Sequence, residues 1–199
     1  MKKLFVLLAS MFFILAFTSA AFAAISGTAH DLSASTSGNQ LCVVCHTPHN
    51  GATAVDAPLW NHALTAENFT MYTSTTLDAT MPADGPIPDG ISKLCLSCHD
   101  GVTGVLDYGG NTGGSPMGGD SALGTDLTND HPVSFVYDTG LATADGELFD
   151  PAATPAVAEL LFGGQVECAS CHDVHDDTNS PFLRMSNANS ALCLTCHDK

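Results

Sequence analysis

The sequence has few basic residues, few aromatic residues and a single long apolar run. Five Lys and Arg stand against 21 Asp and Glu in 199 residues, so the formal net charge is −16. A chain of this charge repels phosphate backbones, which argues against nucleic acid as a partner. Aromatic residues make up only 7% of the chain, so large core-forming side chains are scarce. We therefore expect something other than apolar side chains to fill the interior.

The apolar run lies at the N-terminus. Two lysines precede the apolar stretch 4–17, and Ala21-Phe22-Ala23 provides a small-x-small cleavage site. This is the pattern of a secretory signal peptide cleaved after Ala23, and the stretch is too short to span a bilayer. We predict a signal peptide over residues 1–23 and a mature domain over residues 24–199. The mature protein is expected to be exported, to the periplasm, the cell surface or the extracellular space, and not to span a membrane.

All eight cysteines fall into four copies of one pentapeptide, C-x-x-C-H. This string is the attachment signal for c-type haem, in which two thiols add to one porphyrin and the next histidine becomes the proximal iron ligand. Disulfides and zinc sites are the alternatives, but neither requires a histidine after every second cysteine. We therefore predict four haem c groups, each with its iron. The predicted attachment cysteines are Cys42, Cys45, Cys95, Cys98, Cys168, Cys171, Cys193 and Cys196, and the predicted proximal ligands are His46, His99, His172 and His197.

Five histidines lie outside these motifs, and four distal ligands are needed if every iron is six-coordinate. Each half of the chain has the same order: a lone histidine, a C-x-x-C-H-x-x-H string and an L-C-L-x-C-H-D string. This repeat supplies two proximal and two distal ligands per half. The predicted distal ligands are His30, His49, His131 and His175, whereas His62 is predicted to pack beside Trp60. The alternative is that His62 binds iron in place of His30.

The C-x-x-C-H-x-x-H spacing restricts which haem each distal histidine serves. Axial ligands lie on opposite faces of a porphyrin, whereas side chains three apart on a helical turn have Cβ atoms only about 5–6 Å apart. His49 therefore cannot serve the haem of His46, and His175 cannot serve the haem of His172. Each must reach a neighbouring haem, which brings the porphyrins close together. Close porphyrins exchange electrons quickly.

With so little polypeptide for each haem, we expect a mainly irregular fold, in which short helices and a few short strands wrap around a closely packed chain of four haems. Helical spacing of apolar residues and cysteines predicts a short helix over residues 91–98. A second helix is predicted over 156–162, closed by Gly163-Gly164, and alternation predicts a strand over 133–137.

The domain is expected to contain two pseudo-repeats, at about residues 24–110 and 125–199. Residues 101–129 are rich in Gly, Asn, Asp and Ser. Such a composition is typical of a flexible connection between the halves.

Six strings carry a resemblance to a known family: AHDLS (29–33), CVVCHTPHN (42–50), APLWN (57–61), KLCLSCHDG (93–101), HPVSF (131–135) and ECASCH (167–172). Together they resemble the doubled-CXXCH multihaem c-type cytochromes. Within these, the layout looks like the OmcE-type tetrahaem extracellular cytochromes that form filaments in metal-reducing bacteria. The resemblance implies bis-His ligation at every haem. For a filament, we hypothesise that His30 binds a haem of the adjacent subunit.

Bis-His ligation leaves no vacant iron position for a substrate. We therefore expect an electron-transfer cytochrome rather than an enzyme, serving extracellular electron transport. The expected partners are redox partner cytochromes or extracellular electron acceptors, and further copies of the chain if it forms a filament. The alternatives are a periplasmic carrier or a haem subunit of a multihaem reductase.

Overall fold

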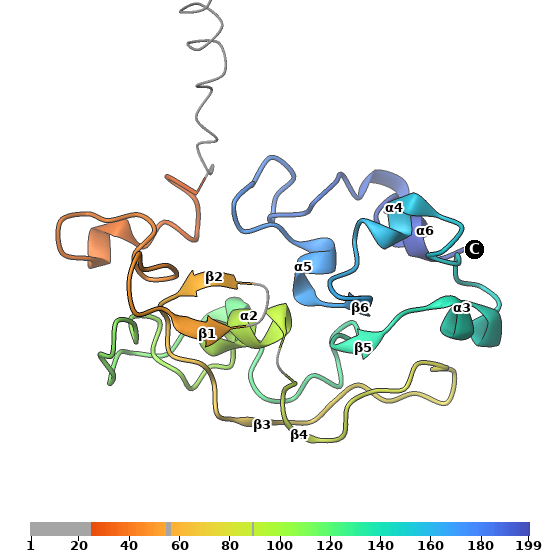
Figure 1. The fold of residues 1–199 in the computed structure, drawn as a ribbon, viewed down its shortest axis with the longest axis horizontal. Coiled ribbons are helices and arrows are strands. Elements are labelled where there is room, and N and C mark those ends of the chain that lie inside the picture. Colours follow the sequence, from red (N-terminus) through yellow and green to blue (C-terminus); the bar gives the residue numbers. More distant parts are fainter. Residues whose placement is uncertain (1–24, 55–56, 89) are drawn as a thin grey trace, which may run out of the picture.

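The computed structural model describes residues 25–54, 57–88 and 90–199. The predicted signal peptide, residues 1–23, lies outside the described residues. Irregular segments connect short helices and short strand pairs (Figure 1). The helical elements are η1 (Ser33–Ser35), α2 (Ile91–His99), η2 (Gly119–Ser121), α3 (Thr139–Asp145), α4 (Pro155–Ala158), α5 (Cys168–Cys171), η3 (Ala188–Ser190) and α6 (Cys193–Cys196). The strands are β1 (Ala52–Ala54), β2 (Ala57–Trp60), β3 (Asn68–Phe69), β4 (Gly85–Pro86), β5 (Phe135–Val136) and β6 (Gln165–Val166), paired antiparallel as β1–β2, β3–β4 and β5–β6.

The helix predicted over residues 91–98 is present as α2, the longest helix described. It buries Leu94 and Leu96 and ends in the C-x-x-C-H motif of residues 95–99. Leu94 and Leu96 point to different sides of the helix, so α2 is buried on more than one side. Helix α2 therefore carries one motif on a regular element.

The second helix is shorter than predicted. Helix α4 begins after Thr154 with Pro155 at its first position, as expected, but it ends at Ala158. Gly163 and Gly164 both have positive φ and close a two-residue turn, across which Phe162 and Gln165 exchange backbone hydrogen bonds. Two glycines with left-handed φ are typical of a type I′ hairpin turn. They therefore open β6 rather than close a helix.

The strand predicted over residues 133–137 is also shorter, because only Phe135–Val136 forms β5. Phe135 and Tyr137 are buried and Val136 is exposed, in the predicted alternation. The alternation breaks at Ser134, which is buried and has a φ of 62°. A positive φ is incompatible with an extended strand, so β5 begins one residue later.

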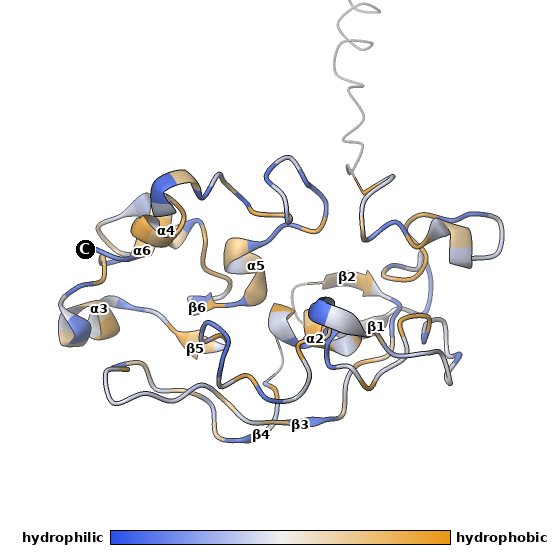
Figure 2. Ribbon diagram, turned by 180° about the vertical axis from the view of Figure 1, so that it is seen from behind, coloured by the Kyte–Doolittle hydropathy of each residue, from blue (hydrophilic) through white to orange (hydrophobic). Residues whose placement is uncertain are grey.

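The apolar interior consists of two small clusters. The first contains Phe135, Tyr137, Leu141, Ala142, Val157 and Val166, and the second contains Phe69, Met71, Ile87, Leu96 and Leu127. Figure 2 shows apolar stretches scattered along the chain, on α5 and α6 among others, and no single apolar layer. The described part of the polypeptide thus provides a limited core of its own.

Residues 101–129 do not behave as a separate flexible connection. Leu127 is only 4% exposed in the second apolar cluster, and the Gly124 amide donates to the His99 carbonyl at the end of α2. The amide of Thr70 also donates to Thr125. Helices α2 and α5, one from each predicted pseudo-repeat, pack together near the centre of Figure 1. The two halves are therefore interlocked.

Candidate haem-binding sites

The four C-x-x-C-H motifs adopt the same local structure. We number them in chain order as site 1 (Cys42, Cys45, His46), site 2 (Cys95, Cys98, His99), site 3 (Cys168, Cys171, His172) and site 4 (Cys193, Cys196, His197). Sites 2, 3 and 4 coincide with the turns of α2, α5 and α6. In sites 1, 3 and 4 the histidine amide donates to the carbonyl of the first cysteine, at 2.8 to 3.0 Å. All eight cysteines lie in the described part of the chain, and none forms a disulfide.

The proximal histidines of three sites are oriented by backbone carbonyls. Nδ1 of His46 lies 2.9 Å from the Pro58 oxygen, and Nδ1 of His172 lies 3.0 Å from the Pro181 oxygen. Nδ1 of His99 lies 2.7 Å from a backbone oxygen of η2. A hydrogen bond at Nδ1 fixes the ring and its tautomer and leaves Nε2 free to bind metal, which is the usual arrangement of histidine ligands. In each of these three histidines, Nε2 is therefore the nitrogen available to bind iron.

Two predicted distal histidines face proximal histidines across a gap that fits an iron atom. The ring centroids of His46 and His175 lie 6.2 Å apart with an interplanar angle of 21°, and those of His30 and His99 lie 6.1 Å apart at 50°. A metal bound between two imidazoles lies about 2 Å from each nitrogen, which separates the ring centroids by about 6 Å. Nδ1 of His30 is also buried without a hydrogen-bond partner. These residues fit a bis-His haem iron.

His30 lies beside His99 of its own chain, which bears on the hypothesis that it serves a haem of the adjacent subunit. The ring of His30 also packs edge-on against Phe182, with ring centroids 4.6 Å apart. Burial, followed by the charge of His99, lowers the pKa of His30. This position argues against the hypothesis that His30 serves a haem of the adjacent subunit.

Site 4 borders a cavity of about 410 Å³, within the range of cofactor pockets. Its lining includes His131 opposite the site 4 motif, together with apolar side chains such as Leu141 and Leu161. Nδ1 of His131 lies 2.9 Å from the Pro132 oxygen, which leaves Nε2 free. The pKa of His197 is lowered by burial and then by the nearby charge of His131. This arrangement suits an apolar, planar cofactor with His131 on its distal side.

The structure does not bring His49 and His172 together. The side chain of His49 is exposed on the loop after site 1, and its neighbourhood contains only local contacts of Thr47. His172 is also exposed, and among the described residues no histidine ring faces it as His175 faces His46. Among the described residues, site 3 therefore has no facing histidine pair of the kind found at sites 1 and 2.

His62 occupies a different environment from the predicted ligands. It is only 2% exposed, and its ring lies near Trp60 at a centroid distance of 6.4 Å. Nδ1 lies 2.8 Å from the Ala63 oxygen, and Nε2 lies 3.1 Å from the Gly104 oxygen. A neutral imidazole donates to only one of these carbonyls. Nε2 also lies 3.4 Å from Sγ of Cys98 in site 2, and the ring neighbour of His62 is Trp60 rather than a proximal histidine. The environment of His62 favours the structural role over the alternative in which it replaces His30.

Contacts between cysteines arrange the sites in chain order. Burial, and then the charge of Cys45 in site 1, raise the pKa of Cys98 in site 2 to about 12. A hydrogen bond between Cys95 of site 2 and Cys168 of site 3 raises the pKa of Cys95 and lowers that of Cys168. Burial, and then the charge of the first site 4 cysteine, raise the pKa of Cys171 in site 3. Each site is therefore a neighbour of the next.

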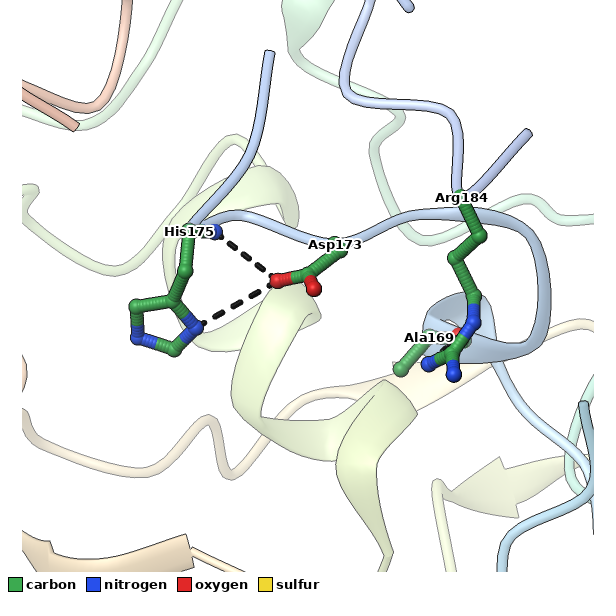
Figure 3. Close-up of polar contacts among 4 residues, drawn as sticks. All are labelled: Ala169, Asp173, His175 and Arg184. Atoms are coloured by element: carbon green, nitrogen blue, oxygen red, sulfur yellow. Dashed lines mark hydrogen bonds and ion pairs between the residues drawn. The ribbon is translucent and has the colours of Figure 1, made fainter. Parts of the chain in front are cut away.

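Asp173 is a site residue that the sequence analysis did not identify. Its Oδ1 accepts a hydrogen bond from the His175 amide at 2.9 Å and lies 3.4 Å from Nδ1 of the same residue (Figure 3). A carboxylate at Nδ1 orients a metal-ligating imidazole. The same close-up shows Arg184, which donates to the Ala169 carbonyl of α5 at 3.3 Å. The D-x-H spacing after site 3 was the available sequence signal for Asp173.

Cysteine pairs with an adjacent histidine and facing imidazoles are the features expected of a protein that binds c-type haem. Residues 162–199, which contain sites 3 and 4, match the family model described as the doubled CXXCH motif. The match supports a multihaem c-type cytochrome that binds haem c covalently and carries electrons, rather than an enzyme. A search of curated proteins gives no significant match. Among the described residues, no helix is long and apolar enough to cross a membrane.

Proposed function

We propose that this protein is an electron-transfer cytochrome with one haem c at each of sites 1 to 4. The observation that carries the proposal is the pairing of His46 with His175 and of His30 with His99, each about 6 Å apart. The two pairs, together with His131 beside site 4, supply distal ligands for three irons. Iron held between two imidazoles exchanges electrons without binding a substrate, which suits a carrier.

The order of the sites supports electron passage along the chain from site 1 to site 4. Cys95 and Cys168 touch, so the porphyrin edges bonded to them lie at the junction of sites 2 and 3. Short edge-to-edge separations make electron transfer fast. The polypeptide then acts mainly to hold four haems in sequence.

The decisive experiment measures haem content directly. The chain is produced with its export signal in a host that attaches c-type haem, and the product is analysed by pyridine haemochrome assay and intact mass. We expect the mass of the chain after Ala23 plus four haems. A colourless product, or one in which the cysteines form disulfides, would refute the proposal.

Self-association into a filament is a second candidate function. The observation that favours it is the exposure of both His49 and His172, neither of which faces another histidine ring among the described residues. In an assembly, His49 of one copy would complete site 3 of another. Negative-stain microscopy and the spin state of the haems on dilution test this: filaments with all haems low-spin support it, whereas a monomer with all haems low-spin contradicts it.

Export and an extracellular or periplasmic position are part of the proposal. The cleavage pattern at Ala21-Phe22-Ala23 supports export, and covalent haem attachment takes place outside the cytoplasm. The net charge of −16 favours basic redox proteins or metal cations as partners. If docking is electrostatic, the rate of electron transfer to such a partner falls as the salt concentration rises.

A further inference from the structure

The N-terminal ends of α2 and α5 meet at a buried carboxylate. Glu167 is only 3% exposed, and its Oε2 accepts a hydrogen bond from the Ser92 amide at 3.0 Å. The hydroxyl of Ser92 also donates to Oε2, and the hydroxyl of Ser134 donates to it at 3.2 Å. All three donors are neutral and belong to segments far from Glu167 in the sequence.

This carboxylate caps two helices at once. Glu167 is the N-cap of its own helix, α5, where its side chain accepts from the Ser170 amide while the Ser170 hydroxyl accepts from the Glu167 amide. Helix α2 begins after Gly90 and has no cap from its own sequence neighbours, so Glu167 satisfies its Ser92 amide instead. The Ser92 hydroxyl in turn accepts from the Cys168 amide at 3.0 Å. A negative group at both helix N-termini stabilises both helices.

The fit around Glu167 is tight. A Cβ atom at Gly90 would lie 2.7 Å from Oε1 of Glu167, closer than such contacts normally come. Ser92, Ser134 and Ser170 are all buried, at 4% exposure or less. The carboxylate thus packs against the start of α2, and its hydrogen bonds to Ser92 and Ser170 link α2 to α5.

The two helices joined in this way carry sites 2 and 3. Cys95 lies one turn into α2 and Cys168 is the first residue of α5, and their sulfur atoms are in hydrogen-bond contact. Glu167 precedes Cys168 in the chain, and its Oε2 accepts from the Ser92 amide one turn before Cys95. The carboxylate therefore lies near both attachment points. A buried negative charge acts strongly because the surrounding dielectric constant is low.

We propose that Glu167 is a positioning residue that sets the separation of haem sites 2 and 3 and lowers the reduction potentials of the two haems together. The inference rests on the proposed function, since it requires haem at both sites. A ferric haem carries one more positive charge than a ferrous haem, so a fixed carboxylate between the two sites stabilises the ferric form of each. Sites 1 and 4, attached to other segments, receive less of this effect.

The test compares Glu167→Gln with Glu159→Gln in the haem-loaded, full-length mature protein. Glutamine keeps the shape of the side chain and removes its charge, and Glu159 is an exposed glutamate at the end of α4, so it serves as the matched control. Potentiometric titration followed by optical and electron paramagnetic resonance spectra gives the individual midpoints. We expect two midpoints to rise in Glu167→Gln and none to change in Glu159→Gln. Unchanged midpoints, or an equal rise of all four, would overturn the proposal.

A second variant covers the case in which Glu167→Gln does not fold. Ser134→Ala keeps the carboxylate but removes one of its donors, so the negative charge is less well compensated. The same two midpoints should then fall, opposite in sign to the first variant. Midpoints that do not move in Ser134→Ala refute the inference in that case.

Haem content separates the two possible failures. If the wild-type protein contains no covalent haem, the proposed function fails. If it contains haem and its midpoints are insensitive to Glu167, only the present inference fails.

Discussion

Removing His175 should open the iron of site 1 and leave the ligation of the site 2 iron unchanged. The ring of His175 faces the ring of His46 at a centroid distance of 6.2 Å. Oδ1 of Asp173 lies 3.4 Å from Nδ1 of His175. Replacing His175 with alanine therefore removes the distal ligand of the site 1 haem. One site in four is affected, so about a quarter of the ferric haem should change from low-spin to high-spin. The pair of His30 and His99 is separate and should remain low-spin.

The angles between the imidazole planes also predict which low-spin signal is lost when His175 is replaced. The imidazole planes of His46 and His175 differ by only 21°, whereas those of His30 and His99 differ by 50°. Nearly parallel ligand planes produce a more rhombic low-spin signal than strongly rotated planes do. His175→Ala should therefore remove the more rhombic of the two signals expected from these pairs in the electron paramagnetic resonance spectrum at low temperature.

His62→Ala is the matched control, because the ring of His62 is buried beside Trp60 and backbone carbonyls rather than facing a proximal histidine. This variant should bind the same number of haems and show no new high-spin signal. The reasoning is refuted if His175→Ala stays fully low-spin, or if His62→Ala produces the high-spin fraction expected of the other variant.

Three further predictions concern the polypeptide around the sites. Burial raises the pKa of Asp100, but hydrogen bonds from the following turn outweigh it and hold the pKa below the ordinary value of 3.8. The folded pKa is thus lower than the unfolded one, so the carboxylate stabilises the fold above about pH 4 and this stability is lost as the pH falls through the folded value. The difference in thermal unfolding between wild type and Asp100→Asn should accordingly shrink in acid. Leu96→Ala, at a side chain 1% exposed, should cost about 2–5 kcal/mol in urea unfolding. Tyr137→Phe removes a hydroxyl that donates to the Phe149 carbonyl at 2.7 Å, with the Cys196 carbonyl 3.2 Å away, and should cost about 1 kcal/mol in the same assay.

The spacing of apolar residues predicted the parts of the fold that neighbouring residues determine. The helical spacing before site 2 predicted α2, and the alternation after Ser134 predicted the buried faces of Phe135 and Tyr137. Gly163-Gly164 was assigned to a helix end because glycine favours that position, but two positive φ values also suit a hairpin turn, and the pairing with β5 decides between them. Tertiary pairing of this kind is not visible in a single short string.

Which histidine faces which motif depends on long-range placement. The spacing excluded His175 as the partner of His172 but did not select His46, which lies in the other half of the chain. Glu167 was missed for the same reason, because its contact with Ser92 joins residues 75 positions apart. A glutamate before a C-x-x-C string has no distinctive pattern, whereas its burial among serine donors is evident only in three dimensions.

The N-terminal segment, residues 25–50, buries little apolar surface of its own. Between residues 25 and 50, Val44 is the one buried apolar side chain described, at 1% exposure. Site 1 is otherwise attached to β2 through backbone groups: the Thr47 amide donates to the Leu59 carbonyl at 2.9 Å, and the Asn61 amide donates to the Cys45 carbonyl at 2.9 Å. So little apolar contact cannot offset the entropy of ordering this segment. If haem is attached at site 1 as proposed, a porphyrin bonded to Cys45 and ligated by His175 would supply both apolar area and a long-range link. We therefore predict that folding of this segment depends on haem binding.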